Sequence, residues 1–227
     1  MLRPRRGEPT PVDRTEAFSD GVFAVAITLL ALDLARIHAD PPNTTLVQAL
    51  RLEWPTLLAF AASFVFIGVA WTNHHNVFRR VALQTRALNG ANLLLLAGVT
   101  MVPWVTATLA SSLGGTSGGD DGRQEILLYA AVTGLGAVTW GILFHVLAIS
   151  PDLLKDPSHA DGFKSDRLAS LVGISTTIVG ALIGYYWNPL VAVGLFLTLP
   201  VFYYALSDGL EPTPSANRSL PTRSGNG

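Results

Sequence analysis

Long stretches without a charged residue are the feature of this sequence that most constrains its fold. Asp, Glu, Lys and Arg are absent from residues 54–78, 87–119, 126–151 and 168–207. A mostly apolar run of about 18 residues or more is long enough to cross a bilayer as a helix. Charged residues make up only 14% of the chain, against about 25% in soluble proteins. The sequence therefore predicts an all-α membrane protein and argues against a soluble enzyme, a disordered chain and a nucleic-acid-binding domain.

The charge-free stretches divide into membrane-spanning helices. The last stretch is 40 residues long, which is about twice a bilayer crossing, and Asn188-Pro189 near its middle is a turn signal. The first helix is harder to place, because its charge-free core has only 12 residues and acidic residues flank it. Such acidic flanks fit a signal peptide poorly. We expect six spanning helices, over residues 16–37, 54–78, 88–112, 126–150, 167–187 and 189–207.

The positions of the basic residues predict the orientation of these helices. Six helices place both termini on one side of the membrane, and 12 of the 15 Lys and Arg residues then fall on that side. Because cytoplasmic loops carry an excess of basic residues, both termini are expected in the cytoplasm. The two halves of the chain show no repeat, so one repeat per chain is expected. The predicted organisation is a cytoplasmic N-terminal segment at 1–15, a six-helix transmembrane domain at 16–207 and a disordered cytoplasmic tail at 208–227.

Several polar residues lie within the apolar helices and need partners, because polar groups in hydrocarbon are costly. Asp20, Asn92 and one of the adjacent pair His74 and His75 fall near the same cytoplasmic depth. This coincidence favours one polar cluster that fastens the first three helices together. The alternative for Ser19 and Asp20 is N-terminal capping or a charge at the interface. Adjacent residues lie about 100° apart on a helix, so we expect one histidine in a hydrogen-bond network and the other facing the headgroups, without a shared metal ion.

The first helix carries an apolar seam at spacings of 4, 3, 4 and 3 residues, formed by Phe18, Val22, Val25, Leu29 and Leu32. Such spacing is typical of a coiled-coil-like contact, and on the pattern alone ordinary core packing is the favoured explanation. Thr28 stands among apolar neighbours. Its hydroxyl is expected either to bond back to the Ala24 carbonyl or to face a pathway.

Three segments of the sequence resemble one membrane-protein family. The run Arg14-x-x-x-Phe18-Ser19-Asp20, continuing to Leu32, resembles the signature helix of bacterial relatives of transmembrane protein 175, the lysosomal potassium channel family marked by Arg-x-x-x-Phe-Ser-Asp. The resemblance continues at residues 71–79, which begin with Trp71-Thr-Asn-His-His, and at residues 88–96 and 102–103. It covers the whole six-helix plan and implies cytoplasmic termini.

The resemblance also implies an assembly and a set of functional residues. Bacterial members of the family are expected to assemble four single-repeat chains around a pore lined by the first helix. Carried over by position, the hydrophobic constriction rings fall on Val25, Leu29 and Leu32, and Thr28 matches a threonine layer implicated in potassium preference. Val25 stands where an isoleucine is usual, which makes that ring smaller. The structural network expected to anchor the first helix comprises Arg14, Phe18, Ser19, Asp20, Trp71, His75 and Asn92.

The leading functional hypothesis is a homotetrameric, potassium-permeable channel of a bacterial inner (plasma) membrane, with K⁺ as the permeant ion, lipid as its surroundings and no cofactor. The alternative is a proton-permeable pathway or a proton-coupled carrier that uses Asp20 and the histidine pair. A membrane enzyme or a metal or haem binder would need His74, His75 and His145 as ligands. The sequence disfavours this third class, because it contains no Cys and no nucleophile motif or phosphate loop. The isolated His145 is expected to pack with a backbone partner.

Overall fold

The computed structural model describes residues 11–35, 45–114, 120–188, 190–196 and 198. Its helices are α1 (Pro11–Leu34), α2 (Leu46–Leu52), α3 (Trp54–Phe78), α4 (Arg86–Gly114), α5 (Asp120–Ile149) and α6 (Ala160–Tyr186), with short 3₁₀ turns at Pro151–Leu153 and Pro157–His159. Residues 190–196 are also helical. Within the described ranges the chain contains no strand, only an isolated bridge between Val81 and Leu154. The predicted all-α class is therefore confirmed for this part of the chain.

Five of the helices are long and apolar enough to cross a membrane, namely α1, α3, α4, α5 and α6. They match the first five predicted spans. The sixth predicted span, at 189–207, lies largely outside the described residues. The predicted break before it is confirmed, because α6 ends at Tyr186 and the chain turns at Trp187 and Asn188. The Asn188 side chain accepts a hydrogen bond from the Leu190 amide at 2.8 Å, which is how an Asx turn redirects the backbone.

The N-terminal boundary and one short helix differ from the prediction. The described part of α1 already includes Pro11, five residues before the predicted start of the span at residue 16, and proline suits the first turn of a helix, where its missing amide proton is not needed. Asp13 adds a carboxylate in that first turn, where the helix dipole favours it. Helix α2 was not predicted. Its signal is the capping box between Thr45 and Gln48, whose side chains cap each other's backbone amides.

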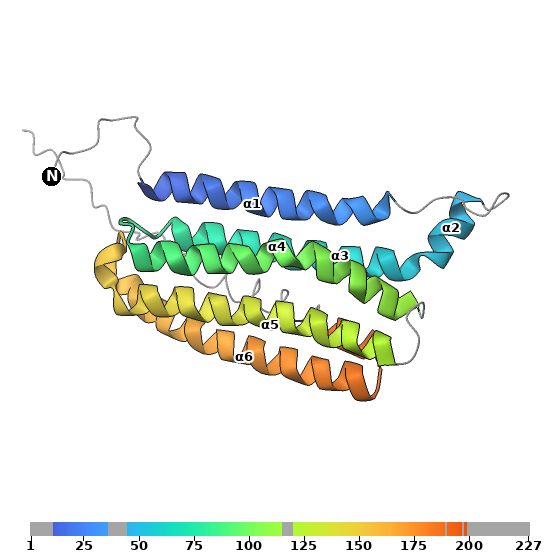
Figure 1. The fold of residues 1–227 in the computed structure, drawn as a ribbon. Helices are drawn as coiled ribbons and strands as arrows, with labels where there is room; N and C mark the ends of the chain where they lie inside the picture. Colours follow the sequence, from blue (N-terminus) through green and yellow to red (C-terminus); the bar gives the residue numbers. More distant parts are fainter. Residues whose placement is uncertain (1–10, 36–44, 115–119, 189, 197, 199–227) are drawn as a thin grey trace, which may run out of the picture.

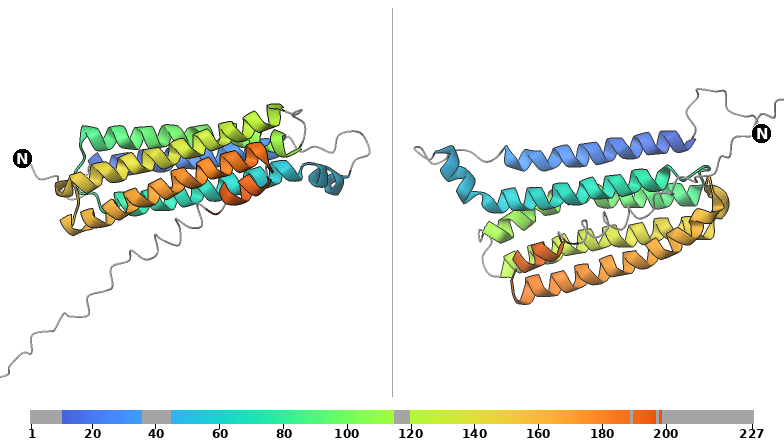
Figure 2. Two further views of the ribbon diagram at one scale, coloured as in Figure 1. Left: turned by 90° about the horizontal axis from the view of Figure 1, so that it is seen from below. Right: turned by 180° about the vertical axis from the view of Figure 1, so that it is seen from behind.

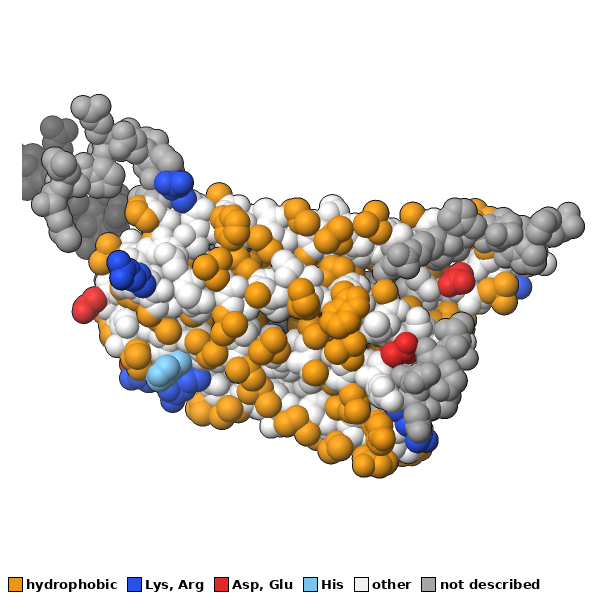
Figure 3. All heavy atoms as spheres, viewed as in Figure 1, with side chains coloured by type: hydrophobic (Ala, Val, Ile, Leu, Met, Phe, Trp, Pro, Cys, Tyr) orange, Lys and Arg blue, Asp and Glu red, His pale blue; other side chains and the backbone are white. Residues whose placement is uncertain are grey.

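The long helices run alongside one another, with α1 at one edge of the bundle and α6 at the other (Figure 1). Helix α1 packs on α3 and α4, α4 packs on α5, and α5 packs on α6. Residues 190–196 turn back alongside α6, as the views in Figure 2 show, and Ala192, Val193 and Phe196 are buried with Ile126 and Tyr129 of α5. The lateral surface in Figure 3 is covered by apolar side chains, with basic side chains gathered toward the ends. This distribution is that of a multi-pass membrane protein.

Two connections are joined by backbone hydrogen bonds at the end of the bundle where α1 begins. The Ala82 amide donates to the Leu153 carbonyl at 2.7 Å, and the Lys155 amide donates to the Arg80 carbonyl at 2.9 Å. The Lys155 ammonium also donates to the Arg79 carbonyl at 2.7 Å. The α3–α4 connection and the α5–α6 connection therefore form one unit, which fixes the two helical pairs relative to each other.

Gly184 lies in close contact with Ile126 and Ala192, and this contact generates a first prediction. A methyl group at Gly184 would lie 2.6 Å from the Cγ2 atom of Ile126 and 2.9 Å from the Cβ atom of Ala192. Gly184→Ala should therefore lower the free energy of unfolding by about 1–3 kcal/mol through overpacking. Gly98→Ala is the control, because Gly98 is buried in α4 but an added methyl group meets nothing within 4 Å. Melting temperatures in detergent should fall for Gly184→Ala alone; equal melting temperatures for both variants would contradict this close contact.

Candidate functional site

Helix α1 has two apolar faces, and the bundle covers only one of them. The covered face consists of Ser19, Phe23, Ala26 and Leu30, all at most 1% exposed. Four of the five residues of the predicted seam lie on the other face: Phe18, Val25, Leu29 and Leu32 are 42–60% exposed, and Val22 is partly buried. Core packing within the chain, which the pattern alone favoured, is therefore wrong for these four side chains. The small side chains of Ser19 and Ala26 on the neighbouring seam allow α1 to approach α3 and α4 instead.

Thr28 lies on the uncovered face of α1. Its hydroxyl donates to the Val25 carbonyl at 2.8 Å, so the back-bond predicted to Ala24 is formed with the carbonyl one residue later. The Thr28 side chain is nevertheless exposed. Because a hydroxyl oxygen that donates its proton keeps two lone pairs, the oxygen still offers acceptor capacity to the space outside the chain.

The covered face of α1 is tied to its neighbours by a buried chain of hydrogen bonds. The Nε2 atom of His74 on α3 lies 2.8 Å from the Oδ1 atom of Asn92 on α4. The Nδ2 atom of Asn92 donates to Ser19 on α1 at 3.0 Å, and the Ser19 hydroxyl donates to the Thr15 carbonyl at 2.8 Å. His74, Asn92 and Ser19 are all at most 1% exposed. In this series of hydrogen bonds the Nε2 proton of His74 is donated to Asn92, so His74, Asn92 and Ser19 each donate one proton to one acceptor.

A second set of contacts joins α1 to α3 at the flank of this buried chain. The Trp71 indole donates to the Asp20 carboxylate at 2.9 Å. The Nδ1 atom of His75 lies 2.9 Å from a carboxylate oxygen of Glu16, and the Trp71 and His75 rings stack with their centroids 6.1 Å apart. The resemblance placed His75 in the anchoring network, whereas the buried chain contains His74. The two side chains point about 100° apart, so only one of them can reach α4.

The start of α1 borders a groove of about 480 Å³ against the first part of α4. Arg14 and Phe18 line it from α1, and Asn89 and Leu93 line it from α4. Gln84 closes one side by donating hydrogen bonds to Thr15 and to Asn89.

The sequence left N-terminal capping open as an alternative role for Ser19 and Asp20. Both residues lie in the interior of α1, which includes Pro11, so neither caps the helix and this alternative is wrong.

A second buried polar cluster, which the sequence analysis did not identify, joins α3, α4 and α5. The hydroxyl oxygens of Ser63 and Thr106 lie 2.6 Å apart, and that of Tyr129 lies 3.3 Å from Ser63. The Thr106 oxygen is also 2.7 Å from the Val102 carbonyl. The Thr106 hydroxyl is the donor toward both Ser63 and the Val102 carbonyl, so these two acceptors share its single proton. The three residues are on different helices, and no sequence spacing relates them.

The described residues contain no group of three or more His, Asp or Glu side chains that could hold a metal ion. The histidines have separate environments: His74 is in the buried chain, His75 is beside Glu16, and His145 of α5 accepts a hydrogen bond from Arg167 of α6 at 3.0 Å. His145 is exposed, so the prediction that it packs with a backbone partner is wrong.

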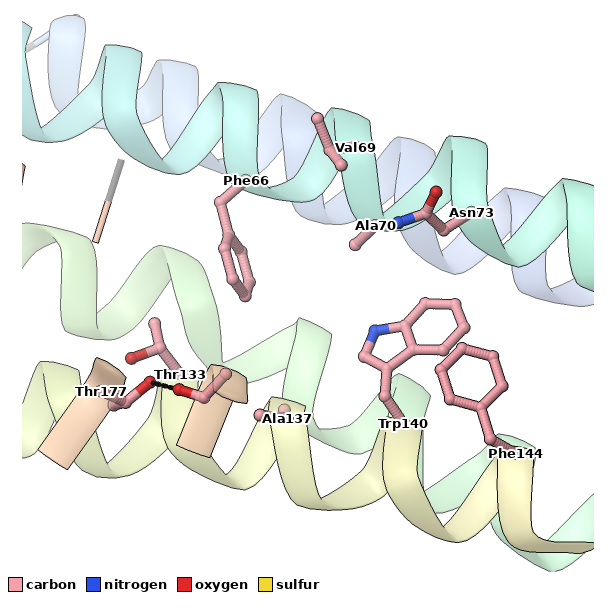
Figure 4. A pocket seen from close by; sticks show the side chains of 11 residues that line it. Phe66, Val69, Ala70, Asn73, Thr133, Ala137, Trp140, Phe144 and Thr177 are labelled. Atoms are coloured by element: carbon pink, nitrogen blue, oxygen red, sulfur yellow. Dashed lines mark hydrogen bonds between the residues drawn. The ribbon is translucent and has the colours of Figure 1, made fainter. Parts of the chain in front are cut away.

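A small cavity lies between α3, α5 and α6 (Figure 4), with a volume of about 60 Å³. Phe66, Asn73 and Trp140 line it together with Thr133 and Thr177. Both threonine hydroxyls donate to carbonyls of their own helices, at 2.9 Å. The lining is otherwise mostly apolar, with the Asn73 carboxamide as a further polar group, and it brings together no charged side chains.

The bundle thus belongs to the class of multi-pass helical membrane proteins. One apolar face of α1 is left uncovered at the edge of the bundle, and polar contacts on the opposite face attach α1 to α3 and α4. Residues 14–103 match the family model described as the endosomal/lysosomal potassium channel TMEM175. In a crystal structure of a lysosomal potassium-selective channel TMEM175 homologue from Chamaesiphon minutus, the similar chain is 31% identical, with a TM-score of 0.71, and the alignment covers 87% of this chain and 98% of that one. The chain belongs to the TMEM175 family, which is a family of ion channels and not of enzymes.

Two named relatives match over less than half of the chain. A protein named as a potassium channel in Streptomyces collinus is 54% identical over 100 residues, which are 44% of this chain and 48% of that protein. The human protein named endosomal/lysosomal proton channel TMEM175 is 40% identical over 103 residues, which are 42% of this chain and 20% of that protein. The chain therefore spans about half the length of the Streptomyces relative in this match and a fifth of the human one.

The buried hydrogen-bond chain generates a second prediction. Asn92→Leu removes the side chain that joins α1 to α3 through α4. It leaves the His74 Nε2 proton without its acceptor and the Ser19 oxygen without its donor. Each unsatisfied buried group costs about 1–3 kcal/mol, so the variant should lose several degrees of thermal stability and show reduced yield. Thr100→Val is the matched control, because Thr100 is exposed on the same helix and bonds only to the Ala97 carbonyl in the described structure. Equal thermal stability of both variants would contradict an anchoring role for Asn92.

Proposed function

We propose that this chain is one subunit of a homotetrameric, potassium-permeable channel in which α1 lines the pore. The observation that carries the proposal is the uncovered face of α1, with Val25, Thr28, Leu29 and Leu32 all exposed while the opposite face is buried. Support also comes from the family and from the names of the Streptomyces and Chamaesiphon relatives, which are called potassium channels.

An assembly is required because α1 lies at the edge of the bundle, where one chain encloses no path. Four copies related by a rotation axis would bring four α1 helices together through one heterologous interface that closes on itself. The uncovered face of α1 would then point to the axis, and α6, at the opposite edge of the bundle, would face lipid (Figure 1). This arrangement gives every exposed apolar residue of α1 an environment without requiring a further partner protein.

The constriction in this arrangement would consist of rings of Val25, Leu29 and Leu32. A narrow apolar passage resists wetting and makes a hydrated ion shed water before it passes. The ion that dehydrates most cheaply then passes most readily, which favours potassium over sodium. The Thr28 oxygen would be the polar group nearest to this passage, with its proton already donated to the Val25 carbonyl.

The polar contacts behind α1 would hold the constriction at a fixed diameter. In this proposal the Ser19–Asn92–His74 chain sets the distance of α1 from α3 and α4, and the Trp71–Asp20 bond sets its rotation. We also propose a bacterial inner (plasma) membrane location with both termini in the cytoplasm, since the basic residues gather on the side of the termini. Lipid and the permeant K⁺ are then the expected partners, and the mechanism uses no cofactor.

Conduction and selectivity can be tested together in liposomes that contain the purified protein. Leu29→Asn would place four polar side chains, one from each subunit, in the narrowest section and would remove the dewetting barrier. The permeability to sodium should therefore rise relative to that for potassium. Thr28→Val keeps the side-chain shape but removes the hydroxyl oxygen, so the potassium preference should fall without loss of expression. The measurement is the reversal potential with potassium on one side and sodium on the other.

Leu182→Asn is the control for this experiment. Leu182 is 52% exposed on α6, the helix farthest from α1, so the same leucine-to-asparagine change should leave the reversal potential at the wild-type value. Unchanged reversal potentials in well-expressed Leu29→Asn and Thr28→Val tetramers would exclude α1 as the selectivity element. A wild-type protein that forms tetramers but carries no ion flux would contradict the channel proposal itself.

Assembly generates a separate prediction about Asp20. Asp20→Ala leaves the Trp71 indole without its acceptor and frees the flank of α1 from α3, so the fraction of tetramer in size-exclusion chromatography should fall. Trp71→Phe removes the same hydrogen bond from the other side and should reduce the tetramer in the same direction. Asp152→Ala, an exposed carboxylate at the same end of the bundle, should assemble as the wild type does. Normal assembly of Asp20→Ala with an altered reversal potential would instead indicate that Asp20 contacts the ion.

A second candidate function is proton permeation through the same pathway, which the name of the human relative favours. Asp20 and the His75–Glu16 pair are titratable groups where α1 contacts α3. Liposomes with a pH gradient and no permeant cation other than H⁺ separate the two candidates. Proton flux that survives removal of potassium and falls in Glu16→Gln would support the second candidate, and its absence would leave the potassium pathway.

A further inference from the structure

Arg167 and His145 form a polar pair on the lateral surface of the bundle, at the edge away from α1. The Arg167 guanidinium on α6 donates to the Nδ1 atom of His145 on α5 at 3.0 Å, and both residues are exposed. Within the described ranges, this is the hydrogen bond that the Arg167 side chain makes. A guanidinium on the outer surface of a membrane-spanning helix, with an imidazole rather than a carboxylate as its partner, retains its positive charge and most of its donors.

The depth of this pair follows from the length of α6. At the far end of the helix, Tyr186 and Trp187 are 77% and 82% exposed, as is typical of aromatic residues at a membrane interface. Arg167 lies 19 positions before Tyr186, which is about 28 Å at 1.5 Å per residue. The hydrocarbon core of a bilayer is about 30 Å thick. Arg167 therefore lies where hydrocarbon meets headgroups, on the side of the bundle where α1 begins.

The neighbours of the pair follow the same division between headgroups and hydrocarbon. Lys164 lies about one turn from Arg167 toward the start of α6 and is exposed, with its ammonium 2.8 Å from the Asp161 carboxylate. Toward the midplane, Leu168 and Leu171 are 60% and 57% exposed. Asp166 is partly buried. The exposed surface thus places Arg167 and the Lys164–Asp161 ion pair at headgroup depth, and leucines at acyl-chain depth.

The donors of the pair suit one kind of ligand. Because a guanidinium can only donate, the Nδ1 atom of His145 is the acceptor, and the proton of the neutral ring is on Nε2. Arg167 and His145 together therefore present several N–H donors and one positive charge. Oxygens of a phosphate diester are strong acceptors, and guanidinium groups bind them in a bidentate manner. A headgroup without a cation of its own would also avoid repulsion from Arg167.

We propose that Arg167 and His145 form a binding site for the phosphate of an anionic phospholipid, whose acyl chain lies along Leu168 and Leu171. Basic groups between helices at this depth are known to attract anionic headgroups. The proposal requires only that the protein is embedded in a membrane. It goes beyond the channel function, and it holds whether the pore conducts potassium or protons.

Native mass spectrometry of the purified full-length protein tests the site directly. Phosphatidylglycerol and phosphatidylcholine with the same acyl chains are titrated in turn, and the number and affinity of bound lipids are measured. The wild type should bind phosphatidylglycerol more tightly, and Arg167→Gln should lose about five- to tenfold in that affinity. Arg167→Lys, which keeps the charge but not the fork of donors, should lose less. His145→Leu should also weaken binding, because it removes the Nε2 donor.

Arg86→Gln is the matched control, since Arg86 is an exposed arginine at the same end of the bundle on α4. The same loss of charge there should leave phosphatidylglycerol affinity at this site unchanged. Equal losses in Arg86→Gln and Arg167→Gln would overturn the site, because they would show a diffuse attraction to the basic end of the bundle. Equal affinity for the two lipids would also overturn it. Inorganic phosphate that displaces phosphatidylglycerol at equal concentration would overturn the assignment to a lipid.

Tetramer content and melting temperature show whether Arg167→Gln has lost only lipid binding or has failed to fold. Arg167→Gln that keeps the wild-type melting temperature in lipid-free detergent but gains less stability than the wild type on addition of phosphatidylglycerol supports the proposal. A variant that binds phosphatidylglycerol as the wild type does contradicts it. Ion flux, measured in the same preparation, should be present in Arg167→Gln, so that failure of the lipid site and failure of the channel proposal give different results.

Discussion

The hydrogen-bond chain from His74 through Asn92 to Ser19 is the interaction on which the position of α1 depends. Inside a bilayer the lipid tails are as apolar as the helices, so burial of apolar surface gives little force to hold one helix against another. Helix α1 is the most weakly enclosed of the long helices and lies at the edge of the bundle. Its attachment therefore depends on close packing of Phe23 and Ala26 and on polar bonds whose alternative is an unpaired group in hydrocarbon.

A second polar cluster extends the same principle along the bundle. Ser63, Thr106 and Tyr129 connect α3, α4 and α5, so each of these helices has at least one bond to a neighbour inside the apolar region. The joined connections at residues 79–82 and 153–155 add backbone bonds at the end of the bundle. Helices α3 to α6 thus form a framework, and α1 is fastened to one side of it with its second apolar face directed outward.

Much of the fold could be predicted from the sequence, because charge-free length and the Asn188 turn are local signals. Five spanning helices and the break after Tyr186 follow from them. The apolar pattern alone could not predict which of two neighbouring seams on α1 is covered, since Phe18, Val25 and Leu29 are as apolar as Phe23 and Leu30. Only the partner helices decide this, and it was the family resemblance that assigned Val25, Leu29 and Leu32 to the other seam. The choice between His74 and His75 depends in the same way on where α4 lies. The bond between His145 and Arg167 joins residues 22 positions apart on two helices, which no single-helix pattern reveals.

The hydrogen bond of Thr28 has a consequence for the sign of the charge that α1 can accommodate. Its proton is committed to the Val25 carbonyl of the same helix, so the exposed side of the oxygen carries lone pairs and no donor. In the proposed tetramer, a ring of four such oxygens would present a partial negative potential to the space it surrounds. Anions of any size would be repelled from this position, whereas cations would gain a partial substitute for lost water, so discrimination by charge would precede discrimination by size.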